Sequence, residues 1–152
     1  FYLYFKTKAE VIRVVLEEAL EELAAQISAG LQLSSETAPE AIRAITKSQV
    51  EFYDKHPALK DMLLQGRAFN GLNLPEEVTA EISGRYRDIV TIPLDRTIRK
   101  GMLQGCYREV DAATAARVLQ SILAELADDD LTPDEKCDLI MAFFEKGIKL
   151  LR

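Results

Sequence analysis

The chain has little of what metal centres and disulfide-bonded domains require. Among its 152 residues there is one histidine, His56, and there are two cysteines, Cys106 and Cys137. A single histidine excludes most metal chemistry, and no Glu is followed three residues later by His, as carboxylate-bridged metal bundles require. A small secreted domain held by disulfides would contain more cysteines. We therefore expect free thiols, no cofactor and a cytoplasmic location.

Long apolar runs and the short motifs of common active sites are also missing. No apolar stretch approaches the roughly 20 residues that cross a bilayer. The sequence contains no glycine-rich phosphate loop, no Gly-x-Ser-x-Gly motif and no Cys–His pairing. An all-helical enzyme is therefore the weakest of the functional hypotheses below, and the expectation is a protein that is not an enzyme.

Basic charge is scarce. The chain has 19 Lys and Arg against 25 Asp and Glu, which gives a net charge of −6 and a pI near 4.9. Proteins that bind DNA usually carry a basic patch, because neutralising phosphates supplies much of their affinity. A local basic bias occurs only in the first eight residues, at Lys6 and Lys8. We do not expect the acidic remainder to bind DNA alone.

The sequence does contain a strong helical pattern. Apolar residues, within a hydrophobic content of 48%, recur every three or four positions, and no segment alternates with a period of two. Helix-capping signals occur at Thr7, Thr37, Asn73, Asp111 and Thr132. The predicted fold is all-α, with about six helices over residues 8–30, 38–55, 57–66, 75–104, 112–127 and 133–151.

The longest predicted helix contains an interior proline. Pro93 lies well inside residues 75–104. An interior proline removes one backbone hydrogen bond and its ring clashes with the carbonyl of the preceding turn. We therefore expect a kink at this position.

The first eleven residues carry a recognisable pattern. It consists of Tyr2, Tyr4, Phe5, Thr7 and Lys8, followed at once by a long amphipathic helix. This pattern resembles the end of the recognition helix and the start of the next helix in TetR-family transcriptional regulators. The later helices resemble the family's regulatory body in architecture alone. The resemblance implies that residues 1–7 are the remnant of an N-terminal helix-turn-helix domain, whose front is absent, and that residues 8–152 form a ligand-binding and dimerisation domain.

The resemblance implies contacts with DNA for three residues. Tyr2, Tyr4 and Lys8 would touch operator phosphates, which position a protein on DNA without reading its bases. The alternative is that the two tyrosines only cover the small core of the missing head.

The resemblance also places a ligand pocket between the helices at 38–55, 57–66 and 75–104. Such pockets are mostly apolar with a few polar groups that orient the ligand, so residues that interrupt apolar faces are the candidates. These candidates are Gln49, Phe52, Tyr53, Met62, Arg67, Phe69, Arg85, Tyr86, Ile89 and Pro93. The expected ligand is a small apolar or aromatic molecule, and Arg67 or Arg85 would accept a carboxylate on it. The alternative for each candidate is ordinary core packing.

The last two predicted helices carry wide apolar faces. In a TetR-like dimer these helices from two chains would form a four-helix bundle. The predicted interface residues are Ala115, Ala116, Leu119, Ile122, Leu123, Leu126, Ile140, Phe143, Phe144 and Ile148. The alternative is that these residues are buried against the chain's own helices.

Together these patterns favour a homodimeric, ligand-responsive transcriptional regulator. The leading hypothesis is a repressor that releases operator DNA when a small, largely apolar molecule binds the helical body. The rival hypothesis is a helical interaction or dimerisation protein that does not bind DNA.

Overall fold

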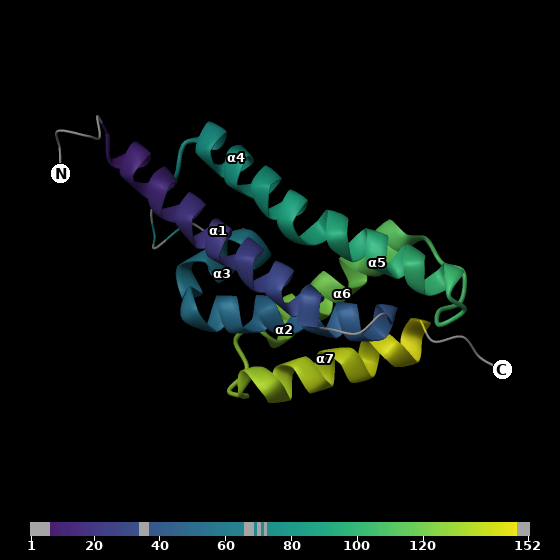
Figure 1. Cartoon of the computed structure of the whole chain (residues 1–152). Coiled ribbons are helices and arrows are strands. Elements are labelled where there is room, and N and C mark those ends of the chain that lie inside the picture. Colours follow the sequence, from purple (N-terminus) through teal and green to yellow (C-terminus); the bar gives the residue numbers. More distant parts are fainter. Residues whose placement is uncertain (1–6, 34–36, 66–68, 70, 72, 149–152) are drawn as a thin grey trace.

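A computed structural model of the chain describes residues 7–33, 37–65, 69, 71 and 73–148. This described part contains helices and no strands (Figure 1). The elements are α1 (Lys8–Leu33), α2 (Ala38–Lys55), α3 (Pro57–Gln65), α4 (Glu76–Tyr86), the π-helical turn η1 (Arg87–Thr91), α5 (Ile92–Leu103), α6 (Ala112–Leu126) and α7 (Pro133–Ile148). The all-α prediction is confirmed, and the helices begin at or next to the predicted residues. None of the described helices is long and apolar enough to cross a membrane.

Helix α2 lies at the centre of the molecule. It runs between α1 and α7 in Figure 1 and also packs against α5. A helix with neighbours on several sides must bury residues on more than one face. The buried residues of α2 are Ala38, Ile42, Ile45, Thr46, Ser48, Gln49, Val50, Phe52 and Tyr53. The central position of α2 therefore carries the amide of Gln49 into the interior.

The segment predicted as one helix over residues 75–104 is interrupted by a π-helical turn. The N–H of Ile92 donates to the carbonyl of Arg87, five residues earlier, and closes a wider turn than an α-helix has. Pro93 follows directly and has no N–H to donate. The ribbons of α4 and α5 run on as one long rod (Figure 1). The sequence predicted a kink at Pro93, and the structure has a π-helical turn directly before this residue.

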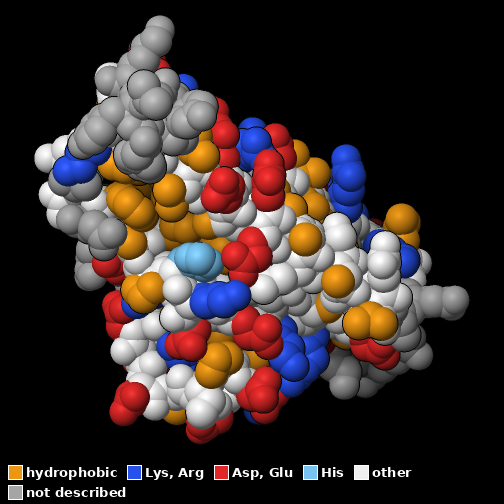
Figure 2. All heavy atoms as spheres, turned by 60° about the vertical axis from the view of Figure 1, so that its left-hand side comes forward, with side chains coloured by type: hydrophobic (Ala, Val, Ile, Leu, Met, Phe, Trp, Pro, Cys, Tyr) orange, Lys and Arg blue, Asp and Glu red, His pale blue; other side chains and the backbone are white. Residues whose placement is uncertain are grey.

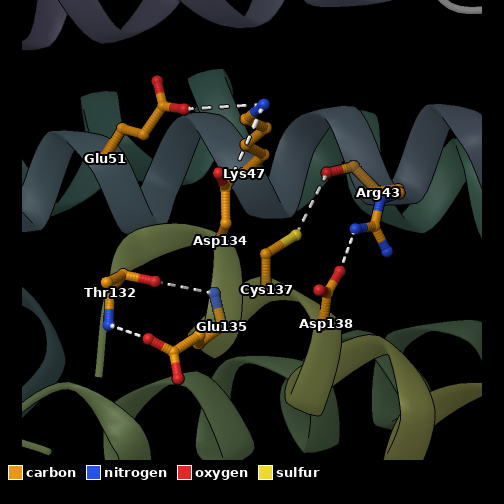
Figure 3. A network of polar contacts seen from close by, with 8 residues as sticks. All are labelled: Arg43, Lys47, Glu51, Thr132, Asp134, Glu135, Cys137 and Asp138. Carbon is orange, nitrogen blue, oxygen red and sulfur yellow. Dashed lines mark hydrogen bonds and ion pairs between the residues drawn. The ribbon is translucent and has the colours of Figure 1, made fainter. Parts of the chain in front are cut away.

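Three of the predicted helix caps are confirmed. The N–H of Glu10 donates to Thr7 Oγ1 at 3.2 Å at the start of α1. The N–H of Thr114 donates to the Asp111 carboxylate at 3.1 Å at the start of α6. At the start of α7, Thr132 and Glu135 satisfy each other's backbone N–H groups at 3.2 and 3.3 Å (Figure 3).

Two predicted caps are wrong. Thr37 forms no side-chain hydrogen bond with α2, and the N–H of Ala38 donates instead to Gln104 Oε1 at 3.3 Å. Helix α4 begins after Pro75 without any side-chain cap, so Asn73 does not cap it. The physical reason for the first difference is that the end of α5 lies beside the start of α2 and supplies a distant acceptor.

Helix α7 packs along α2, and polar contacts join the two helices (Figure 3). Lys47 lies 3.6 Å from Asp134, and the Arg43 guanidinium pairs with Asp138. These side chains are largely exposed, so each pair contributes only about 0–1 kcal/mol. Cys137 is buried at the same contact and, like Cys106, is a free thiol, as predicted. Burial raises the pKa of the Cys137 thiol and keeps it protonated.

Candidate ligand site

A cluster of three polar side chains lies among the apolar helices. Gln49 Nε2 donates to Gln120 Oε1 at 2.9 Å, and Gln120 Nε2 donates back to Gln49 Oε1 at 3.0 Å. Gln49 Nε2 also donates to the Tyr86 hydroxyl at 2.5 Å, and that hydroxyl donates to Gln120 Oε1 at 3.1 Å. We call Gln49, Tyr86 and Gln120 the Gln–Tyr cluster. It joins α2, the end of α4 and the middle of α6.

The cluster supplies the hydrogen bonds that the buried amide of Gln49 on α2 requires. Gln49 has no exposed surface, and a buried amide without partners costs about 1–3 kcal/mol. The reciprocal bonds with Gln120 remove that cost. Tyr86 also stands immediately before the π-helical turn, and such turns often occur at functional sites.

Gln120 was not predicted from the sequence, although a signal exists. Ala116, Leu119 and Leu123 are buried on α6, and Gln120 lies on the same helical stripe at the spacing of one core-facing side. A polar residue on an apolar stripe is a candidate for an interior hydrogen bond. The separation of 71 residues from Gln49 hides the partner from any local pattern.

The three side chains of the cluster are electrically neutral. Burial raises the pKa of Tyr86 to about 12, so its hydroxyl stays protonated at neutral pH. Tyr53 is packed beside it, with ring centroids 6.2 Å apart, and burial raises the pKa of Tyr53 as well. The hydroxyl of Tyr53 is buried and makes no hydrogen bond of ordinary geometry within the described part of the chain.

A groove leads from the cluster to the surface between α3 and α6. Its volume is about 380 Å³, within the usual range for small-molecule sites. The lining residues are Leu63, Leu64, Tyr86, Thr91, Ala116, Arg117, Gln120, Ser121 and Ala124. Leucine and alanine side chains form apolar parts of the wall, and the polar groups among them could orient a small molecule through hydrogen bonds.

The other predicted ligand residues do not converge on this groove. Phe52 and Met62 are buried in the core, and Ile89 packs against it. Arg85 lies near α1, where its charge acts on the carboxyl of Glu17. Pro93 is half-buried in α5, Phe69 lines a different cleft, and Arg67 lies outside the described residues. The structure therefore brings together Gln49, Tyr53 and Tyr86 from the predicted set and adds Gln120.

The second cleft lies between α1 and the corner that joins α2 to α3. Its volume is about 530 Å³, and apolar side chains gather beside His56 on this face (Figure 2). Phe69 and Leu16 contribute apolar walls. The charged rim is already paired: Glu22 lies 2.8 Å from Lys55 Nζ and 3.7 Å from His56 Nε2. The hydrogen bond from Lys55 lowers the pKa of Glu22.

The apolar faces of α6 and α7 are only partly free. Of the ten predicted interface residues, Ala116, Leu119, Leu123, Ile140, Phe144 and Ile148 are buried in the chain's own core. Ala115, Ile122 and Leu126 are half-buried, and Phe143 is 62% exposed. Val118, which was not predicted, is 49% exposed beside them. Ala115, Val118, Ile122 and Phe143 line a hollow of about 320 Å³, and we call them the α6–α7 face.

The residues predicted to contact DNA lie at the start of the chain. Lys8 is exposed and is the first residue of α1, whereas Tyr2 and Tyr4 lie outside the described residues. Within the described ranges, no group of three or more His, Cys, Asp or Glu side chains is placed to hold a metal ion.

No protein-family model and no curated protein matches the sequence, but solved structures match the fold. A TetR/AcrR-family transcriptional regulator from Thermobifida fusca YX-ER1 is 20% identical with a TM-score of 0.75, covering 96% of this chain and 77% of that one. A TetR-family regulatory protein from Rhodococcus RHA1 is 17% identical with a TM-score of 0.75, covering 99% and 79%. AibR, solved with isovaleryl coenzyme A and operator DNA, is 16% identical with a TM-score of 0.66, covering 93% and 77%. The chain therefore has the fold of TetR-type regulators, as predicted.

Proposed function

We propose that the chain is the regulatory body of a ligand-responsive transcriptional regulator that acts as a homodimer. The observation that supports the proposal is the shared fold: nearly the whole chain superimposes on two regulators of the TetR type and on AibR, which was solved with isovaleryl coenzyme A and operator DNA. The Gln–Tyr cluster and its groove supply a site for a small, largely apolar effector. The proposed response is release of the operator when that effector binds.

Helix α1 is the element that would transmit the signal. It begins at Lys8, directly after the residues that resemble the end of a recognition helix. Its contact with α4 includes an ion pair between Arg13 and Glu81, 3.2 Å long. A hydrogen bond with Glu81 also raises the pKa of Glu17 on α1. A ligand against Tyr86 at the end of α4 would therefore act on the helix that packs along α1.

A ligand shifts such an equilibrium only by binding one arrangement more tightly than the other. We propose that occupation of the groove favours the position of α4 in which the two heads of the dimer no longer fit adjacent half-sites. Those half-sites lie about one helical turn of DNA apart. Tyr2, Tyr4 and Lys8 would contact operator phosphates in the unliganded state.

The α6–α7 face is the proposed dimer contact. Phe143 and Val118 are large exposed apolar side chains on neighbouring helices, and the hollow between them would receive the same residues of a second chain. A two-fold contact of this kind buries the same patch on both partners.

The test uses the complete gene product and DNA from the region around its gene. We expect a gel shift at moderate salt that requires the residues preceding α1, and loss of the shifted band when a ligand of the groove is added. If the complete gene product binds no segment of that DNA but binds a helical partner protein, the result would favour the rival hypothesis of an interaction protein that does not bind DNA.

A further inference from the structure

The hydrogen bonds of the Gln–Tyr cluster leave one amide N–H group available at the groove. Gln49 uses both N–H groups of its amide, on Gln120 Oε1 and on the Tyr86 hydroxyl. Gln120 Oε1 accepts from Gln49 and from Tyr86, which fills both of its lone pairs. Gln120 Nε2 donates one N–H to Gln49 Oε1. Its second N–H has no partner among the described residues.

The position of this N–H decides what can use it. Gln49 is fully buried and does not line the groove, whereas Tyr86 is 9% exposed and lines it beside Gln120. Gln120 is half-buried and lines the groove. Among the amide groups of the cluster, the unused one at the groove is therefore a donor, and a ligand that reaches it must supply an acceptor.

We propose that the groove binds an uncharged molecule with a carbonyl-type oxygen, which accepts the second N–H of Gln120, and an apolar body that lies against Leu63, Leu64 and Ala116. This inference rests on the proposed function only in treating the groove as the effector site. The ligand class covers ketones, esters and amides of about the size that 380 Å³ admits.

A carboxylate at the same place is disfavoured by the charge of the site. The cluster contains no cation, and one neutral N–H does not offset the several kcal/mol lost when an anion leaves water. Arg117 does line the groove, but its Nη2 donates to Thr114 Oγ1 at 3.2 Å on the exposed side of α6. An anion paired with Arg117 would remain at the rim in water, where such pairs are worth little.

The test compares three probes with one phenyl body: benzylacetone, which carries a ketone, hydrocinnamate, which carries a carboxylate, and butylbenzene, which carries no polar group. Each is titrated into the isotope-labelled chain by calorimetry, while the side-chain amide resonances of Gln120 are followed by NMR. We expect benzylacetone to bind most tightly and to shift the Gln120 amide protons. The NMR measurement does not depend on any variant.

Two variants sharpen the comparison. Gln120→Glu keeps an oxygen for Gln49 and Tyr86 but has no N–H to donate, so it loses the bond to Gln49 Oε1 as well as the bond to the ligand. Its affinity for benzylacetone should fall at least about tenfold, the loss expected for one hydrogen bond. Its affinity for butylbenzene, which accepts no hydrogen bond, should fall less. Glu125→Gln exchanges the same two groups on the exposed side of α6 and should leave both affinities unchanged.

The outcomes separate this inference from the proposed function. Tighter binding of hydrocinnamate than of benzylacetone at Gln120 overturns the uncharged ligand class and leaves a regulator with an acidic effector. A Gln120 resonance that no probe shifts overturns the assignment of the groove. Binding of benzylacetone at Gln120, with operator binding by the complete gene product unchanged when the groove is filled, supports the ligand class and overturns the regulatory function.

Discussion

Gln49 on α2 and Gln120 on α6 hold each other through two reciprocal amide hydrogen bonds, although 71 residues separate them in the sequence. Each amide satisfies the hydrogen bonds of the other and so lowers the free-energy cost of burying it. The pair therefore links the central helix to a helix of the proposed dimer contact, and it has consequences for stability.

Removal of one member of the pair should cost more than removal of both. Gln49→Leu leaves Gln120 and Tyr86 short of partners, and we expect a loss of about 2–3 kcal/mol in the free energy of unfolding. The double variant Gln49→Leu/Gln120→Leu should recover part of that loss. Urea denaturation of the four proteins of the cycle measures the coupling. Strictly additive losses would show that the two amides do not depend on each other.

Gly101 should not tolerate a methyl group. A Cβ at this position would lie 2.2 Å from Cδ2 and 2.4 Å from Cε2 of the Tyr107 ring, which is itself buried. We expect Gly101→Ala to lower the free energy of unfolding by about 1–3 kcal/mol, because the ring must move within a packed core. Gly84→Ala is the control, since nothing lies within 4 Å of its Cβ, and it should stabilise α4 by about 0.5–1 kcal/mol. Equal effects of the two changes would contradict the close approach.

The two threonine positions that look alike in sequence should behave differently. Thr132→Ala removes a reciprocal cap and should destabilise the protein by about 1 kcal/mol. Thr37→Ala should cost little, because Thr37 makes no capping hydrogen bond and Gln104 accepts the N–H of Ala38 instead. Thermal denaturation of both variants tests the difference, and a larger loss at Thr37 would contradict the structure.

Dimer formation should depend on the α6–α7 face. We expect Phe143→Glu to weaken self-association at least about a hundredfold, since a charge would be buried against an apolar partner surface. Leu103→Ser is the control, because Leu103 is 90% exposed at the end of α5 and does not line the hollow. Sedimentation equilibrium measures both. A dimer that resists Phe143→Glu but dissociates with Leu103→Ser would move the contact elsewhere.

Stability should fall at alkaline pH through Tyr86. Its pKa is raised by burial from the ordinary 10.0 to about 12 in the folded chain. The unfolded chain therefore releases this proton first, so the contribution is complete below pH 10 and is lost as the pH rises towards 12. Two pKa units correspond to about 3 kcal/mol, as an order of magnitude.

The variant Tyr86→Phe should show a shallower loss over the same pH range, after allowance for its lower stability at neutral pH. Denaturation followed at several alkaline pH values gives the two slopes. Parallel slopes for the two proteins would mean that the hydroxyl of Tyr86 titrates normally in the folded state.

Much of the secondary structure was predictable because its causes are local. The caps at Thr7, Asp111 and Thr132 act over three residues, so the residues that form them stand next to each other in the sequence. Pro93 likewise acts on its own helix, and the interruption appears directly before it as η1. The failed cap at Thr37 shows the limit, since its replacement comes from Gln104, 66 residues away.

The candidate site was predictable only in part. Gln49, Tyr53 and Tyr86 were identified as polar or aromatic residues on apolar faces, and they do lie together. Phe69 satisfied the same criterion but lines the cleft beside His56. Periodicity shows which side of a helix is apolar, but it does not show which neighbour that side meets.

By itself, the sequence determined the helical class and the starts of the helices, because these depend on hydrogen bonds and steric contacts within one or two turns. The tertiary structure alone decided that Gln120 completes the Gln–Tyr cluster and that a groove reaches it. It also decided that Leu119 and Phe144 are buried in the chain's own core, whereas Phe143 and Val118 are exposed. These features arise where helices distant in the sequence pack together, and packing depends on the shapes of all the partners at once.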